Sequence, residues 1–186
     1  GEVVAASGKD TPSRMDTRYK NGYKKRLTPQ LGYSFLYDAT KTPSDFGKSV
    51  VLSRKAELLP RPVGKLVVSE PAAATLVKSE GSVYTFDLQR ELAGQLYLDF
   101  YSDREQKLTI SYGEHMKFGK VERIIGNRDF SVEYIAKKGR NRYVNPFLRL
   151  GLRFLEIAAE YPADINAATV LPVCYPLVRR KFVADT

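Results

Sequence analysis

The side chains that could act together in chemistry lie in one segment, residues 110–134. It contains the only histidine of the 186 residues, His115, with Glu114 before it and Asp129 after it. Two carboxylates are what hydrolysis of a glycosidic bond requires, and a serine triad would have to use this histidine. Carboxylates at strand ends also cap turns and pair with arginines, and a histidine before a glycine-containing turn commonly forms a surface hydrogen bond. We therefore predict a polar cluster at one edge of a β-sandwich, formed by Tyr112, Glu114, His115, Arg128 and Asp129.

Other catalytic and metal-binding patterns are missing from the sequence. It has no Gly-x-Ser-x-Gly elbow, no phosphate-binding glycine loop and no His-Glu-x-x-His helix. The single cysteine, Cys174, can form neither an internal disulfide nor a zinc site alone. We expect no catalytic residue, no metal and no cofactor in this chain.

The net charge of +9 is concentrated in the first part of the chain. Residues 1–80 hold 14 Lys/Arg against 8 Asp/Glu, whereas residues 81–186 hold 16 against 13. The run Arg18–Arg26 with Tyr19 and Tyr23 could follow a phosphate backbone, but a short charge run is commonly a solvated loop. We predict no nucleic-acid partner and keep a basic nucleic-acid-binding module as an alternative. No apolar run approaches the roughly 20 residues of a membrane span.

Alternating apolar residues predict strands from residue 82 onward. They occupy residues 83–88, 95–101, 107–114 and 129–136, and apolar stretches follow at 153–161 and 168–178. Strands at this spacing, with no amphipathic helices between them, indicate an all-β fold. We predict an antiparallel β-sandwich of the jelly-roll or concanavalin-like type over residues 82–178.

Residues 1–81 are predicted to be a loop-rich N-terminal extension with a few strands. Strands are expected at residues 49–53 and 65–69, while the alanines of residues 70–78 would also allow a short helix. Residues 179–186 are interpreted as the start of a linker. The apolar stretch 170–182 should dock on the sandwich through its first half. Its second half, with Arg179, Arg180 and Lys181, should be exposed or engaged in a crystal or dimer contact.

Several motifs in order resemble one family. "FDLQRELAG", "YGE", "RDFSVEY" and "LGLRF" are similar to motifs of the β-sandwich that precedes the catalytic barrel in bacterial α-L-rhamnosidases. Gln89 stands where the family pattern has glycine. The resemblance covers residues 82–175, and the matching residues are Phe86, Asp87, Leu88, Arg90, Glu91, Gly94, Tyr112, Gly113, Glu114, Arg128, Asp129, Leu150, Gly151, Arg153 and Phe154.

The resemblance implies an accessory role. In such enzymes the catalytic carboxylates lie in an (α/α)₆ barrel that follows the sandwich, so they have no positions in this chain. We expect a non-catalytic domain that supports this barrel in polysaccharide degradation, inactive alone, with a periplasmic or secreted bacterial location. Residues 1–81 would be a linker and the remnant of a preceding sandwich.

An independent carbohydrate-binding module is the first alternative. Sugars stack on aromatic rings, and tryptophan is absent, so tyrosines would have to serve a rhamnose-containing carbohydrate. Alternation also places tyrosines in the core. The sugar-stacking candidates are Tyr84, Tyr97 and Tyr101, with Tyr112 and Tyr134 as further members.

Overall fold

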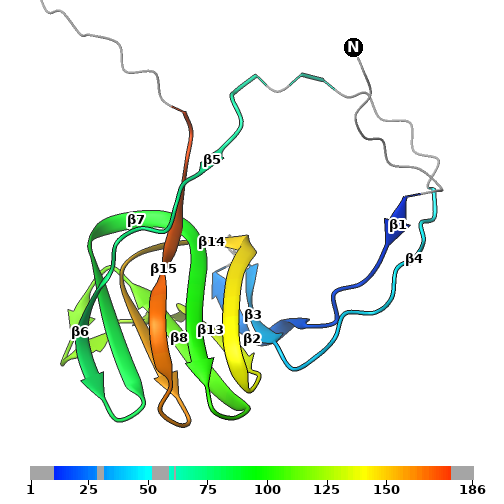
Figure 1. The fold of residues 1–186 in the computed structure, drawn as a ribbon. Coiled ribbons are helices and arrows are strands. Elements are labelled where there is room, and N and C mark those ends of the chain that lie inside the picture. Colours follow the sequence, from blue (N-terminus) through cyan, green and yellow to red (C-terminus); the bar gives the residue numbers. More distant parts are fainter. Residues whose placement is uncertain (1–10, 29–31, 52–58, 61, 177–186) are drawn as a thin grey trace, which may run out of the picture.

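The computed structural model describes residues 11–28, 32–51, 59–60 and 62–176, and within them every regular element is a strand (Figure 1). The prediction of an all-β fold is confirmed. One nine-stranded sheet dominates the described part. Its strands, in spatial order, are β2 (Tyr19–Thr28), β3 (Gly32–Asp38), β13 (Ser131–Ala136), β8 (Gln106–Gly113), β14 (Gly139–Ala159), β7 (Val83–Ser102), β15 (Asp164–Cys174) and β5 (Val67–Val68), and β6 (Thr75–Glu80) pairs with β7.

Two long strands, β7 and β14, build both layers of the sandwich. They pair antiparallel from Ser102 opposite Gly139 to Val83 opposite Ala158, and Figure 1 shows β7 arching over the top. The second half of β7 pairs with β15 and with the first half of β14; we call these three the β15 layer. The first half of β7 and the second half of β14 join β6, β8, β13, β3 and β2; we call these the β8 layer. The pairing of β7 with β14 is irregular where the two strands turn from one layer into the other.

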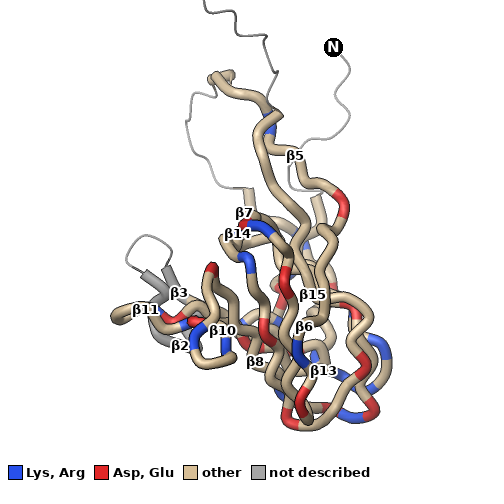
Figure 2. Tube along the Cα trace, turned by 90° about the vertical axis from the view of Figure 1, so that its left-hand side faces the viewer, with Lys and Arg blue, Asp and Glu red and all other residues tan. Residues whose placement is uncertain are grey.

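The connection between β8 and β13 forms two short hairpins. The first pairs β9 (Met116–Lys117) with β10 (Lys120–Val121), and the second pairs β11 (Ile124–Ile125) with β12 (Arg128–Asp129). Figure 2 shows β10 and β11 at one side of the sandwich. The turns contain Gly119 and Gly126, whose φ angles are +73° and +60°, so the left-handed conformation there suits glycine.

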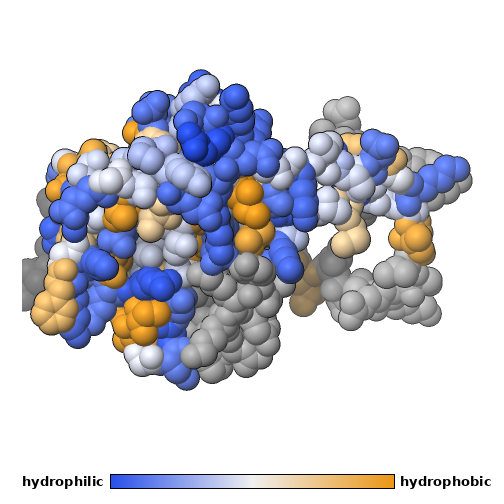
Figure 3. Space-filling view, turned by 90° about the horizontal axis from the view of Figure 1, so that it is seen from below, coloured by the Kyte–Doolittle hydropathy of each residue, from blue (hydrophilic) through white to orange (hydrophobic). Residues whose placement is uncertain are grey.

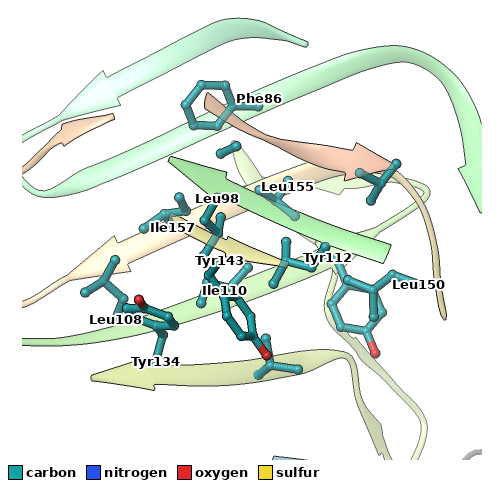
Figure 4. Packing of buried hydrophobic residues seen from close by; sticks show 14 of the residues in the cluster. Phe86, Leu98, Leu108, Ile110, Tyr112, Tyr134, Tyr143, Leu150, Leu155 and Ile157 are labelled. Atoms are coloured by element: carbon teal, nitrogen blue, oxygen red, sulfur yellow. The ribbon is translucent and has the colours of Figure 1, made fainter. Parts of the chain in front are cut away.

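The long strands place most of their apolar side chains between the two layers. Viewed from below, apolar surface occurs as separate patches among hydrophilic side chains (Figure 3). Inside, residues of both layers pack together (Figure 4). The apolar residues that alternate in the sequence are therefore those on the inward face of each strand. The fully buried large side chains are Tyr134, Phe100, Leu96, Leu98, Leu108, Ile110, Leu150, Leu152, Leu155, Ile157 and Val132.

Some details differ from the sequence-based expectations. The segments 83–88 and 95–101 are halves of the single strand β7, because the bend between the layers keeps its pairing with β14. The ambiguous stretch 70–78 contributes to β6 and forms no helix. One pairing, β13 with β3, is parallel. Residues 49–51 are not a strand, and the remainder of the strand expected at 49–53 lies outside the described residues; β4 (Gly47–Lys48) precedes it and pairs with β1 (Pro12–Ser13).

The sheet does not stop at residue 82. Strands β3, β5 and β6, all from the first 81 residues, pair with strands of the sandwich, and β2 joins the sheet by pairing with β3. Sequence propensity missed β3 because its partner β13 comes from far along the chain, and β2 joins the sheet only through β3. The division into an extension and a sandwich remains a prediction about domains, and the hydrogen-bonded sheet crosses its boundary.

The C-terminal stretch docks on the sandwich as predicted for its first half. Val170 is fully buried, Leu171 and Pro172 pair with Gln95 and Gly94, and Val173 pairs with Val68. Residues 177–182, with Arg179, Arg180 and Lys181, lie outside the described residues.

Candidate functional site

The backbone brings the predicted rim residues to one end of two strands. Ser131 of β13 is paired with Ser111 of β8, and the Tyr112 N–H donates to the Phe130 carbonyl at 3.0 Å. Residues 114 and 115 therefore leave β8 beside the point where residues 128 and 129 approach β13. Antiparallel pairing explains this placement.

Asp129 is held inside this end by hydrogen bonds. Nη1 of Arg123 lies 3.0 Å from Oδ1 of Asp129 and 3.0 Å from Oγ of Ser131, and the Ser131 hydroxyl donates to Asp129 Oδ1 at 2.7 Å. Tyr112 is buried nearby, and its burial, followed by the negative charge of Asp129, raises the pKa of its phenol. The hydrogen bonds of the Asp129 carboxylate therefore hold this end of the sandwich together.

The other rim residues do not join that network. Glu114, His115 and Arg128 are exposed, and no side-chain hydrogen bond or ion pair joins them to any residue in the described part of the chain. The structure thus brings Tyr112 and Asp129 together and leaves the remaining three facing solvent. A functional role for the five as a unit stays a prediction.

The tyrosines divide into buried and accessible ones. The hydroxyl of Tyr84 accepts a hydrogen bond from the Ala163 N–H at 3.0 Å, and that of Tyr134 donates to Asn141 Oδ1 at 3.2 Å. Tyr84, Tyr112 and Tyr134 all belong to the core, so their ring faces are covered. Tyr97 is half-buried and Tyr101 is 47% exposed, and these two remain available for stacking.

Between the two accessible tyrosines lies an ion-paired aspartate that sequence reasoning missed. Asp99 accepts from Nε and Nη2 of Arg140 at 3.0 and 2.8 Å, and from the same atoms of Arg142 at 3.3 and 3.1 Å. The hydrogen bonds from Arg140 foremost, and those from Arg142, lower the Asp99 pKa to about 2 against the opposing effect of burial. The available signal was the alternation of Arg140 and Arg142, which places both on one face of β14.

The motif residues stabilise the bend of the long strands. Nε and Nη2 of Arg153 each lie 3.0 Å from a carboxylate oxygen of Asp87, and these hydrogen bonds lower the Asp87 pKa. Gln89 has a φ of +62°, and its N–H donates to Asp87 Oδ1 at 2.6 Å. Glycine would adopt this conformation without strain.

A groove of about 1040 Å³ lies beside this bend. It is lined by residues of the ranges 69–73, 88–93 and 172–174, among them Glu70 and Glu91. Strand β15 approaches β7 closely here, since a Cβ on Gly94 would overlap the carbonyl oxygen of Leu171. The groove therefore lies between residues 88–93, which belong to the motif "FDLQRELAG", and the end of β15.

Metal and membrane features can be stated for the described residues. Among them, no group of three or more His, Cys, Asp or Glu side chains is placed to hold a metal ion. None of the described segments forms a helix long and apolar enough to cross a bilayer. From the basic run Arg18–Arg26, the side chain of Arg18 pairs with Asp16 at 2.7 Å.

Comparison with known proteins places the fold. No protein-family model and no curated protein matches the chain. Among solved structures, an α-L-rhamnosidase from Streptomyces avermitilis in complex with L-rhamnose matches 82% of this chain with a TM-score of 0.59 and 16% identity. A native α-L-rhamnosidase from Aspergillus terreus matches 80% of it with a TM-score of 0.56 and 20% identity. The chain covers only 16% and 19% of the length of those proteins.

The chain therefore has a fold that is found as one part of α-L-rhamnosidase chains. The resemblance predicted from the ordered motifs is confirmed at the level of this fold. The two enzymes are several times longer than the matched region, so a larger parent protein with further domains is plausible.

Proposed function

We propose that this chain is a non-catalytic accessory β-sandwich of an α-L-rhamnosidase-type glycoside hydrolase, which supports and positions a helical catalytic barrel. The observation that carries the proposal is the fold match, which takes in about four-fifths of this chain and less than one-fifth of each enzyme. The structural bonding of Asp87, Asp99 and Asp129 to arginines supports it, because carboxylates so engaged are poor candidates for general acids.

The surface that would face the barrel is proposed to be the two hairpins. Phe118 is 95% exposed at the tip of the first hairpin, and Ile124 and Ile125 of the second are 51% and 48% exposed. Phe118 also has a φ of +51°, a strained conformation for a bulky residue. Neighbouring domains cover such apolar side chains, since interdomain contacts bury several hundred square ångströms or more.

Hydrolysis is the first test. The purified chain should not release the aryl group from an aryl α-L-rhamnoside, because the proposed function gives it no acid–base pair. Turnover that co-purifies with the chain and is lost in Glu91→Gln or Glu114→Gln would contradict the proposal. The first variant tests the groove, and the second tests the predicted rim.

Docking is the second test. The chain is produced together with the helical domain of a longer gene product, and the melting temperature of that domain is measured. Phe118→Ser should lower it, whereas Val77→Ser should not, since Val77 is also an exposed apolar residue (53%) but lies on β6. Equal melting temperatures for both variants and the unchanged protein would count against docking through the hairpins.

Carbohydrate binding is a second candidate function because Tyr97 and Tyr101 are accessible on the outer face of β7. It is compatible with an accessory role. Measurable affinity of the isolated chain for a sugar would distinguish it from a purely supporting domain.

A further inference from the structure

The outer face of the β15 layer carries a row of side chains along β7. Tyr97, Asp99 and Tyr101 alternate in sequence and share this face, because Leu98 and Phe100 between them are fully buried on the opposite face. On β14, Arg140 and Arg142 are the residues paired with Tyr101 and Asp99. We call the five outward residues, Tyr97, Asp99, Tyr101, Arg140 and Arg142, the β7 strip.

The arginines of the β7 strip are oriented but not saturated. Asp99 engages Nε and Nη2 of each, and Nη1 of each has no hydrogen-bond partner in the described part of the chain. The side chains are 62% and 61% exposed, whereas that of Asp99 is 8% exposed. A guanidinium has five N–H donors, so both arginines retain donors for a ligand while their carboxylate partner restrains them.

The charged and aromatic side chains of the strip follow one another along β7. The pKa of Arg140 is raised chiefly by its hydrogen bond to Asp99, and the phenol of Tyr97 adds to this effect. The register gives the order of the side chains: Tyr101 lies opposite Arg140 and Asp99 opposite Arg142, and Tyr97 follows on the same face of β7.

The spacing sets the kind of ligand. Tyr97 and Tyr101 are four residues apart, which corresponds to about 13 Å along a strand. One small molecule cannot lie against both rings, but a short linear polymer can.

We propose that the β7 strip binds a linear oligosaccharide, with Tyr97 and Tyr101 stacking on pyranose rings and Arg140 and Arg142 donating to hydroxyl or carboxylate oxygens. Sugars present apolar C–H faces and a rim of hydroxyls, which match an aromatic ring beside fixed donors. A nucleic-acid backbone fits less well, because Asp99 neutralises part of the positive charge that phosphates require. The inference rests on the proposed function only for the choice of rhamnose-containing probes.

The test is native affinity electrophoresis of the chain, followed by calorimetry. The probes are a linear oligosaccharide of alternating rhamnose and galacturonic acid, its carboxyl-reduced neutral form, and cellohexaose. Binding to at least one is expected, with a loss of tenfold or more in Tyr101→Ala and retention in Tyr101→Phe, which keeps the ring. Tyr175→Ala is the matched control, since Tyr175 is equally exposed at 47% but follows the far end of β15.

Each outcome of this test either supports or overturns binding by the β7 strip. Tighter binding of the acidic probe than of its reduced form would assign the arginines to a carboxylate, and equal binding would assign them to hydroxyls; both support the strip. No binding to any probe at millimolar concentration would overturn the proposal. Equal losses in Tyr101→Ala and Tyr175→Ala would overturn it too. Neither result would affect the barrel-docking test, which is read from melting temperatures and not from sugar affinity.

Discussion

Two aspartates, Asp99 and Asp129, show how differently the same ion pair is used in two regions of the molecule. Asp99 lies on a regular strand, is 8% exposed and binds two arginines that are themselves more than half exposed. Asp129 lies in a hairpin connection, is 22% exposed and binds one arginine, Arg123, that is 35% exposed. In the first region the cations face outward, and in the second the ion pair is bonded to the neighbouring Ser131.

The different surroundings of Asp99 and Asp129 indicate which region is better suited to bind a ligand. The hairpin region contains the only histidine of the sequence, yet its aspartate is hydrogen-bonded to Arg123 and Ser131. The strand region has no unusual composition, yet it presents oriented donors between two accessible rings. Pre-organised donors on a rigid element are better placed for binding than isolated polar residues in a turn.

The largest effect is expected at Gly94, on which the β15 layer depends. Gly94→Ala should destabilise the protein by about 3 kcal/mol, because the new Cβ would overlap the Leu171 carbonyl and push β15 from β7. Urea unfolding measures the loss. Gly151→Ala is the control, since nothing lies within 4 Å of a Cβ there, and an equal loss in both variants would refute the steric explanation.

The two aspartates themselves give the next effect. Asp99→Asn should reduce the free energy of unfolding by about 1 to 2 kcal/mol at neutral pH, since it weakens charged hydrogen bonds to two arginines. Asp129→Asn should cost less than about 1 kcal/mol, because a single partly exposed arginine is involved. A larger loss for Asp129→Asn would reverse the comparison.

The contribution of Asp99 to stability should depend on pH. The Asp99 pKa is lowered from 3.8 to about 2, so the ionised form is favoured in the folded protein. Its contribution is therefore complete above pH 3.8 and is lost as the pH falls through about 2. The stability difference between the unchanged protein and Asp99→Asn, measured by urea unfolding at several pH values, should shrink over that interval. A difference that stays constant down to pH 2 would contradict it.

A smaller effect, with the opposite sign, is expected at the bend. Gln89→Gly should stabilise the protein by about 0.5 to 1 kcal/mol, because glycine adopts the positive φ without the clash that a Cβ causes. Arg90→Gly is the matched control on the next residue, where no positive φ is present, and it should destabilise. Thermal unfolding of both variants decides whether backbone strain is the cause.

The smallest effect is expected where chemistry was first sought. His115→Ala and Glu114→Gln should each change the free energy of unfolding by less than about 0.5 kcal/mol, since both side chains are exposed and unpaired in the described part of the chain. Chemical denaturation is the measurement. A loss above 1 kcal/mol for either would show that the rim residues act together after all.

The sequence predicted which residues share one face of a strand, but it did not predict which strands or side chains pair with each other. Alternation predicted a strand over residues 95–101, and its apolar residues Leu96, Leu98 and Phe100 are all buried on one side, because side-chain direction along a strand is local. The pairing of Asp99 with Arg140 and Arg142 spans 41 and 43 residues, and it depends on a strand register that no local pattern encodes. The same limit hid β3, which joins the sheet by parallel pairing with β13.

The same limit applies to the tyrosines predicted to stack on sugars. Of the three candidates, Tyr97 and Tyr101 are accessible, whereas Tyr84 lies in the core. Period-two alternation separates the two faces of a strand without saying which layer covers each. The arginines that complete the β7 strip became apparent only from the pairing of β14 with β7.

The arching course of β7 and β14 has a consequence for how the chain acquires its structure. Each layer contains half of β14, and the residues it pairs with on β7 precede it by 37 positions at one end and 75 at the other. Such distant pairings slow folding, so we expect refolding on a scale of about milliseconds to seconds. During synthesis, the β8 layer lacks part of β14 until Ala159 has left the ribosome, and the β15 layer lacks β15 until Cys174 has done so.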